Sequence, residues 1–259
     1  MPGLELHSVV EGPPEAPALV LLPSLGATVE MWEPQARALA GSLRVVRLDT
    51  RGHGGSPVPL GPYTVDELGA DVLATLDALG IERFSVAGVS LGGSLALWLG
   101  AAAPERVERL VVCFSSAHYG GREAWLERAA TVRAEGAGAV ADAVVGRWFT
   151  AGFAAREPEA VARMRAMIAS TPAEGYAGCC EALADLDLRP RLAGIGAPTL
   201  VLSGSEDPAT PAEHGEAIRD GVPGARFELV DGVAHVGSFE RPDLVNDLIR
   251  GHLEAEARR

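Results

Sequence analysis

A serine framed by two glycines, at the junction of an apolar strand and an apolar helix, constrains this chain more than any other feature. The residues are Gly88-Val89-Ser90-Leu91-Gly92, and the apolar run Phe84 to Val89 leads into them. Glycine at both flanking positions permits a sharp turn, since side chains there would collide with the neighbouring strand and helix. The pattern predicts a strand–turn–helix unit that exposes Ser90 in a cleft, as a nucleophile requires. An ordinary glycine-rich turn is the alternative.

Three of the histidines lie far enough downstream of Ser90 to follow both the serine and an intervening acid. These three are the candidates for the general base. A serine needs a histidine to take its proton and a carboxylate to orient that histidine, in the order serine, acid, histidine. His214 stands beside glutamates, which indicates a solvated helix face, and His252 on the last charged helix is expected to be exposed. His235 follows the strand-like run Arg226 to Val230 in a glycine-containing loop. We therefore predict His235 to be the base.

The acid is expected at the end of the preceding strand, where Glu206 and Asp207 follow an apolar run. Pro208 holds the backbone before it in an extended turn, which suits a carboxylate aimed into a cleft. An acid one strand earlier is excluded, because the segment 115–119 contains no carboxylate. We predict Asp207 to be the acid and Glu206 to be its exposed neighbour, with Glu206 as the alternative acid.

Backbone N–H groups are needed to stabilise the oxyanion of acyl transfer. One is expected from the residue after the nucleophile, Leu91, and one from the loop after an early strand. Pro23-Ser24-Leu25-Gly26-Ala27 follows the strand-like run Ala18 to Leu22 and contains a glycine, so Leu25 is the predicted second donor. A plain strand-to-helix loop is the alternative interpretation.

Composition excludes several classes of function. The chain has 259 residues and a formal net charge of −13, which argues against nucleic acid as a partner. It has no lysine, so Schiff-base chemistry is excluded, and its three cysteines and six histidines show no spacing typical of a metal site. No signal peptide is expected, because Met1 to Val10 has neither a basic start nor a continuous apolar core. No membrane span is expected either, because glycines divide the longest apolar stretch, Phe84 to Ala103. A cytoplasmic location is the expectation, and the oligomeric state is left open.

Short apolar strands alternate with helical runs, which is typical of a mostly parallel sheet with helices on both faces. The predicted strands are Glu5 to Val10, Ala18 to Leu22, Arg44 to Leu48, Phe84 to Val89, Leu110 to Phe114, Thr199 to Leu202 and Arg226 to Val230. The predicted helices are Met31 to Ala40, Val65 to Leu79, Leu91 to Ala103, Ala212 to Asp220 and Asp243 to Ala257. Strand signals vanish in residues 120–197, where alanine-rich helices follow one another, so we expect a helical cap inserted before the penultimate strand. The core domain would comprise residues 1–119 and 198–259.

The segment Asp49 to Ser56 combines charge with glycine directly after a strand. Without a P-loop lysine it cannot be a phosphate-binding loop. We expect a structural turn held by Asp49 and Arg51, with His53 as part of that turn.

These residues resemble the α/β-hydrolase superfamily, and longer phrases resemble its 3-oxoadipate enol-lactonases along nearly the whole chain. The phrases are Ser24-Leu25-Gly26 with Met31-Trp32, Asp49 to Ser56 with Gly61-Pro62-Tyr63-Thr64, Gly88 to Gly93, Arg147-Trp148-Phe149-Thr150, Glu174 to Cys180, Asp207 to Pro211, and Ala234-His235. Three positions depart from that family: Pro23 stands in place of asparagine, Val236 in place of leucine, and Gly237-Ser238 in place of serine-asparagine.

The resemblance implies a serine hydrolase that opens an enol-lactone through an acyl-enzyme, with a small-molecule lactone or ester as substrate and neither metal nor cofactor. Such a lactone carries a carboxylate, and we expect Arg147 beside Trp148 in the cap to bind it; a surface charge and a packed ring are the equal alternative. A general carboxylesterase or perhydrolase, or a carbon–carbon bond hydrolase, would use the same Ser90, Asp207 and His235. A ligand receptor built on a hydrolase scaffold is the alternative from another class.

Overall fold

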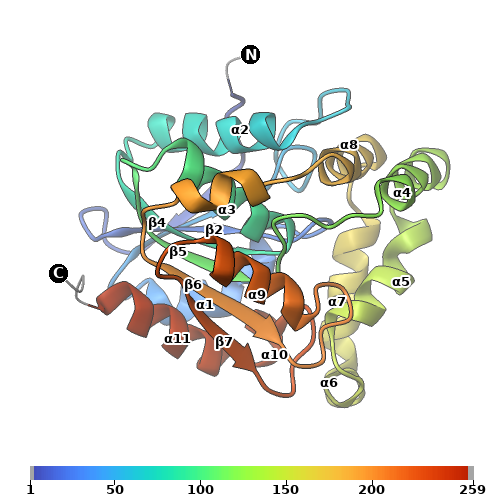
Figure 1. Cartoon of the computed structure of the whole chain (residues 1–259). Helices are drawn as coiled ribbons and strands as arrows, with labels where there is room; N and C mark the ends of the chain where they lie inside the picture. The colour runs from blue at the N-terminus through green and yellow to red at the C-terminus, as the bar shows by residue number, and fades with distance from the viewer. Residues whose placement is uncertain (1–2, 256–259) are drawn as a thin grey trace.

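A seven-stranded sheet forms the centre of the computed structural model, which describes residues 3–255 (Figure 1). The strand order is β1-β3-β2-β4-β5-β6-β7, with β1 antiparallel to β3 and every other neighbouring pair parallel. The strands are β1 (Ser8–Glu11), β2 (Ala18–Leu22), β3 (Arg44–Leu48), β4 (Phe84–Val89), β5 (Val107–Cys113), β6 (Thr199–Gly204) and β7 (Arg226–Val230). The predicted mostly parallel sheet is confirmed.

Four strands, β2, β3, β4 and β7, have the predicted bounds. All residues of β2 and β4 are buried, because parallel strands covered on both faces read as continuous apolar runs. The prediction for β5 began too late, at Leu110. The strand pairs from Val107, and the exposed Glu108 in its first half concealed the pattern.

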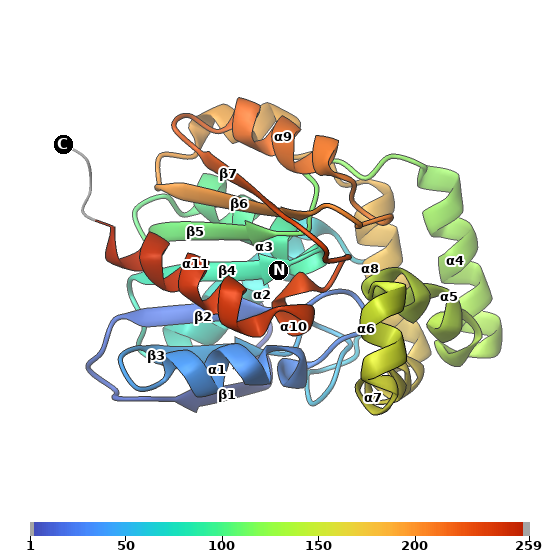
Figure 2. The same ribbon diagram turned by 90° about the horizontal axis from the view of Figure 1, so that it is seen from below.

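Helices cover both faces of the sheet, α1 and α11 on one face and α2, α3 and α9 on the other (Figure 2). Their bounds are α1 (Glu33–Leu39), α2 (Val65–Ala78), α3 (Leu91–Ala102), α9 (Ala212–Gly221), α10 (Gly237–Glu240) and α11 (Pro242–Glu254). The predicted helix Met31 to Ala40 is divided into the 3-10 turn η1 (Val29–Trp32) and α1, whose first turn accommodates Pro34. Residues 256–257 of the last predicted helix lie outside the described residues.

Five helices form a cap between β5 and β6, at the carboxyl ends of the strands (Figure 1). They are α4 (Arg122–Glu135), α5 (Gly138–Trp148), α6 (Ala151–Arg156), α7 (Pro158–Ala169) and α8 (Ala173–Ala184). The predicted cap before the penultimate strand is confirmed. The 3-10 segment η2 (Arg189–Gly194) follows the cap and packs against α3 and α9 of the core. The division into domains at residues 119 and 197 stays a prediction.

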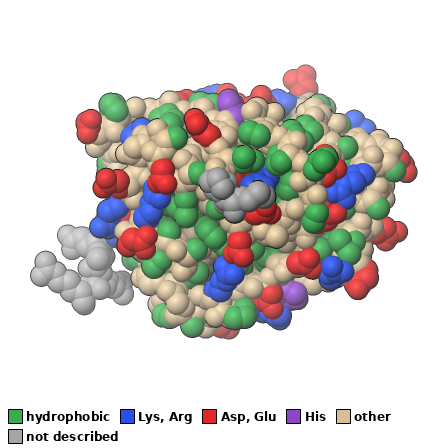
Figure 3. Space-filling view, turned by 90° about the horizontal axis from the view of Figure 1, so that it is seen from above, with side chains coloured by type: hydrophobic (Ala, Val, Ile, Leu, Met, Phe, Trp, Pro, Cys, Tyr) green, Lys and Arg blue, Asp and Glu red, His purple; other side chains and the backbone are tan. Residues whose placement is uncertain are grey.

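The surface shows no gathered basic patch on the face drawn in Figure 3, where acidic and arginine side chains are interspersed. None of the helices within residues 3–255 is both long and apolar enough to cross a bilayer.

The two elbow glycines are required by close backbone contacts rather than by their own dihedral angles. A Cβ on Gly88 would lie 2.1 Å from the carbonyl oxygen of Gly92, and a Cβ on Gly92 would lie 2.1 Å from that of Leu22. Backbone atoms at the centre of a sheet cannot yield, so the helix α3 would have to move off the sheet. The sequence-based reason for both glycines is confirmed.

Gly92→Ala is expected to destabilise the protein by about 3 kcal/mol or more, because overpacking against backbone has no cheap relief. The measurement is the urea midpoint. Gly251→Ala in α11 is the matched control, since its Cβ meets nothing within 4 Å, and it should leave stability unchanged or slightly raised. Equal midpoints for the two variants would contradict the steric argument.

Candidate active site

Ser90 occupies a strained turn between β4 and α3. Its φ of +56° and ψ of −118° are unusual for a residue with a side chain. The turn is held from below: the Ser90 amide donates to Cys113 O at 3.1 Å, and the Ser115 hydroxyl donates to Ser90 O at 2.6 Å. The pairing of the parallel strands β4 and β5 therefore fixes the position of the Ser90 side chain relative to the end of the sheet.

Asp207 and His235 lie side by side although 28 residues separate them. The loops after β6 and β7 carry them, and the parallel strands bring the two loops together. His235 Nδ1 lies 2.9 Å from Asp207 Oδ2, and both side chains are buried. A carboxylate only accepts hydrogen bonds, so Nδ1 carries the proton and Nε2 is left as an acceptor for a hydroxyl.

The Asp207 carboxylate is held by its own turn. Oδ1 accepts the amides of Ala209 at 2.8 Å and Thr210 at 3.0 Å, and Oδ2 accepts the Thr210 hydroxyl at 2.7 Å. Burial alone would raise the pKa of Asp207, but His235 and these hydrogen bonds outweigh it, so the pKa lies below its ordinary value. Glu206 is exposed, as expected from the sequence.

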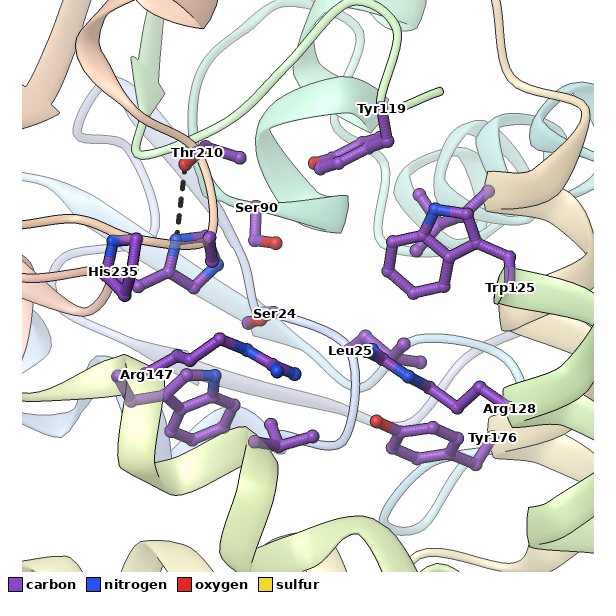
Figure 4. A pocket seen from close by; sticks show the side chains of 15 residues that line it. Ser24, Leu25, Ser90, Tyr119, Trp125, Arg128, Arg147, Tyr176, Thr210 and His235 are labelled. Carbon is purple, nitrogen blue, oxygen red and sulfur yellow. Dashed lines mark hydrogen bonds between the residues drawn. The ribbon is translucent and has the colours of Figure 1, made fainter. Parts of the chain in front are cut away.

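A cavity of about 260 Å³ opens under the cap, and both Ser90 and His235 line it. Figure 4 shows the Ser90 hydroxyl turned into the cavity and away from the imidazole ring. Rotation about the Ser90 Cα–Cβ bond reorients the hydroxyl, and such contacts often tighten only when substrate binds. The structure thus places Ser90 and His235 on one cavity and Asp207 against His235, and among residues 3–255 no hydrogen bond joins the Ser90 hydroxyl to His235.

Leu25, in the loop after β2, lines the same cavity. Gly26 has φ +80°, so the loop needs glycine there. The Gly26 amide donates to His53 Nε2 at 2.9 Å, while His53 Nδ1 lies 3.1 Å from Arg51 O and must be the donor. Burial lowers the pKa of His53 and keeps the ring neutral in this role. Within residues 3–255 the Leu25 amide has no hydrogen-bond acceptor.

Both Asp49 and Arg51 brace the turn after β3, as predicted, but they belong to separate networks and do not bond each other. Asp49 instead accepts the Val29 amide at 2.7 Å and the Gly55 amide at 2.9 Å. Arg51 pairs with Asp71 of α2 at 2.6 Å. Two separate networks thus brace the turn, because Asp49 faces the loop after β2 and Arg51 faces the neighbouring helix.

Two arginines face each other across the cavity, Arg147 from α5 and Arg128 from α4 (Figure 4). No aspartate or glutamate within residues 3–255 lines the cavity. Among the described residues, neither arginine has a carboxylate within 4.0 Å. Burial, together with Arg128, lowers the pKa of Arg147. The cavity of an acidic protein therefore carries an uncompensated positive charge.

Aromatic rings and one free hydroxyl also line the part of the cavity that contains the two arginines. Arg128 lies 4.6 Å from the ring centre of Trp125, and Trp148 forms another wall. Tyr176 is fully buried, and its hydroxyl has no hydrogen-bond partner among residues 3–255. Figure 4 draws that hydroxyl toward the two arginines. An anion with oxygen acceptors would satisfy all three groups at once.

The predicted Arg147 and Trp148 line the cavity, and sequence reasoning missed three further lining residues, Arg128, Trp125 and Tyr176. A signal was present: Trp125 and Arg128 are one helical turn apart and so share a face, repeating the tryptophan–arginine pairing of α5. Nothing in the sequence shows that α4 and α5 turn these faces toward each other.

The two histidines set aside in the sequence are less exposed than expected. His252 is buried, and its Nε2 lies 3.1 Å from Pro198 O, so the prediction of exposure is wrong. Helix α11 packs against the sheet through its apolar face, and His252 lies on that buried face. His214 is half-buried, with Nδ1 2.7 Å from the Ser116 hydroxyl. Both lie outside the cavity.

Metal-ligating side chains are not gathered in the described part of the chain: no three histidine, cysteine, aspartate or glutamate residues there are placed to hold an ion.

Known proteins are similar to this chain both in fold and in amino-acid sequence. The family model of the alpha/beta hydrolase fold matches residues 17–242. Two 3-oxoadipate enol-lactonases of Acinetobacter baylyi are each 38% identical, one over 94% of this chain and 91% of its own length, the other over 98% and 94%. The crystal structure of the enol-lactonase from Burkholderia xenovorans LB400 superposes with a TM-score of 0.94 at 41% identity and covers 96% of both chains. This chain is therefore a hydrolase of the alpha/beta hydrolase family.

Proposed function

We propose that this protein is a serine hydrolase that opens an enol-lactone ring bearing a carboxylate, in the manner of a 3-oxoadipate enol-lactonase. The observation that carries the proposal is the pair of unpartnered arginines in the cavity that also contains Ser90 and His235. The names of the relatives point to the same substrate class.

The first half of the reaction acylates the enzyme. Ser90 Oγ attacks the lactone carbonyl while His235 Nε2 takes its proton, and Asp207 stabilises the resulting imidazolium. The amides of Leu25 and Leu91 hold the oxyanion. The ring C–O bond then breaks, the leaving oxygen takes the proton from His235, and the enol relaxes to a ketone. An enol is a good leaving group, so little is asked of His235 as an acid.

The second half releases the acid. Water gives a proton to His235 Nε2 and attacks the acyl carbonyl, the bond to Ser90 Oγ breaks, and His235 returns the proton to Ser90. The chain's own residues perform each of these steps.

We assign substrate selection to the part of the cavity that Arg128 and Arg147 line. A carboxylate there would receive charge-assisted hydrogen bonds from Arg128 and Arg147, with the Tyr176 hydroxyl as a further donor. A neutral ester would leave both guanidinium groups without a partner. The cavity therefore favours a carboxylated lactone over the general esterase and perhydrolase substrates.

Arg147→Ala is expected to lower kcat/KM for 3-oxoadipate enol-lactone by about 10- to 100-fold, since a hydrogen bond to a charged group contributes about 1.5–3 kcal/mol. Hydrolysis of p-nitrophenyl acetate should change by less than about 2-fold, because that ester has no carboxylate to lose. The measurement is the ratio of kcat/KM for the two substrates by absorbance.

Arg165→Ala supplies the matched control, because Arg165 is exposed on the cap and pairs with Asp142 outside the cavity. It removes the same charge and should leave the ratio unchanged. Equal losses on both substrates in Arg147→Ala would overturn the assignment of the carboxylate site. A wild-type enzyme that cleaves the neutral ester but not the lactone would favour a general carboxylesterase.

A further inference from the structure

The loop that carries His235 is hydrogen-bonded on both sides of that histidine. On one side the Ala234 amide donates to Glu240 Oε2 at 2.8 Å. On the other the Val236 amide donates to the carbonyl oxygen of Trp148 at 2.9 Å. Trp148 lies at the end of α5 and lines the cavity, so this second bond joins the loop directly to the cap.

Glu240 joins the first side to the cap as well. Its other oxygen, Oε1, accepts the Thr150 amide at 3.0 Å and also the Thr150 hydroxyl. Three phenylalanine rings of the same two segments also pack together, with centres 4.9 Å apart for Phe149 and Phe153 and 6.1 Å apart for Phe149 and Phe239. Helices α6 and α10 accordingly lie side by side in Figures 1 and 2.

Glu240 as a residue is only 8% exposed, and its carboxylate accepts from two donors of the cap residue Thr150 and one of the histidine loop. A buried carboxylate depends on every such donor, because none is replaced by water when it is lost. The cap segment and the histidine loop are thereby held as one unit.

We propose that Glu240 is a positioning residue for His235. Through Glu240 and Trp148, the location of the imidazole ring is set by the cap segment 148–150 and not by the loop alone. Proton transfer between Ser90 and His235 depends steeply on such placement, since a displacement of about 1 Å can lower the rate roughly 100-fold. Glu240 itself does not line the cavity.

Glu240→Gln is the first test. Both donors of Thr150 should bond the amide oxygen of the glutamine, so its NH₂ group faces the Ala234 amide. Two donors cannot bond each other, and the link to the histidine loop is lost without a change in side-chain volume. With p-nitrophenyl acetate, kcat per active site is expected to fall about 10-fold with KM unchanged within about 2-fold, because the proton transfer and not binding is impaired. Active sites are counted by stoichiometric labelling of Ser90 with a fluorophosphonate, which removes any unfolded fraction from the comparison.

Thr150 provides a second, independent variant. Thr150→Val removes the hydroxyl and should lower kcat as Glu240→Gln does, while Thr150→Ser keeps the hydroxyl and should restore it. Thr75→Val is the matched control: its hydroxyl in α2 is also buried and accepts the Leu6 amide at 2.9 Å, far from the cavity. It should lower the melting temperature without lowering kcat.

The proposal rests on His235 acting as the base, and the neutral ester separates the two ideas. Wild-type kcat in both Glu240→Gln and Thr150→Val, or a loss no larger than that of Thr75→Val, would overturn the positioning role. Failure of the lactonase proposal would show instead as absent activity on the carboxylated lactone, whatever these variants do to ester hydrolysis.

Discussion

Ser90→Ala is expected to lower kcat by about 10⁴-fold or more on both the lactone and a neutral ester, because it removes the attacking oxygen. Of the hydroxyls near it, those of Ser94 and Ser115 bond backbone carbonyl oxygens, at 2.8 Å and 2.6 Å. Steady-state rates at high enzyme concentration, together with loss of fluorophosphonate labelling, provide the measurement. Activity above about 1% of wild type would contradict a serine nucleophile.

Two further variants sharpen this result. Ser42→Ala, an exposed serine away from the cavity, should retain wild-type activity. Ser90→Gly should be as inactive as Ser90→Ala but more stable by about 1 kcal/mol, since glycine adopts a positive φ without the strain that alanine keeps. Greater stability of the inactive glycine variant would show that strain at the turn is maintained for the sake of the side chain it presents.

Asp207→Asn is expected to lower kcat by about 10³- to 10⁴-fold. The amides of Ala209 and Thr210 already hold Oδ1, so the asparagine oxygen should take that place and turn its NH₂ group toward His235. Nδ1 must then accept a hydrogen bond, the ring proton moves to Nε2, and Nε2 can no longer take the proton of Ser90. The measurement is kcat across the pH range 5–8.

The pH dependence has a definite sign. The pKa of Asp207 lies below its ordinary value near 4, so the wild-type carboxylate stays ionised throughout that range. Titration of Asp207 should therefore contribute no change in the deficit of Asp207→Asn from about pH 5 to 8, and it should reduce the deficit only below about pH 4, where the wild-type carboxylate begins to be protonated. Glu206→Gln should leave kcat unchanged. A large loss in Glu206→Gln with none in Asp207→Asn would move the acid to Glu206.

A short segment of sequence was sufficient to predict a feature wherever the contacts that cause the feature lie within or next to that segment. Gly88, Gly92 and the residues between them predict the turn at Ser90, because the clash that requires glycine involves the strand and helix that the same segment forms. Asp207 was distinguished from Glu206 because the following proline sets the turn that holds its carboxylate. Continuous apolar runs likewise predicted β2 and β4, which are buried on both faces.

Long-range packing decided what the sequence missed. Arg128 and Arg147 become a pair only because α4 and α5 face each other over the cavity, and Tyr176 joins them from α8. Glu240 meets Thr150 across 90 residues. His252 appeared exposed on a charged helix, yet the rotation of α11 on the sheet buries it.

The sequence by itself determined the alternation of strands and helices, the elbow and the two loops that carry Asp207 and His235, because short-range sterics and strand burial leave few other solutions. Only the tertiary structure decided which cap side chains share the cavity and how the cap holds the histidine loop. Those contacts depend on the angles at which separately formed helices pack, and no spacing along the chain encodes such angles.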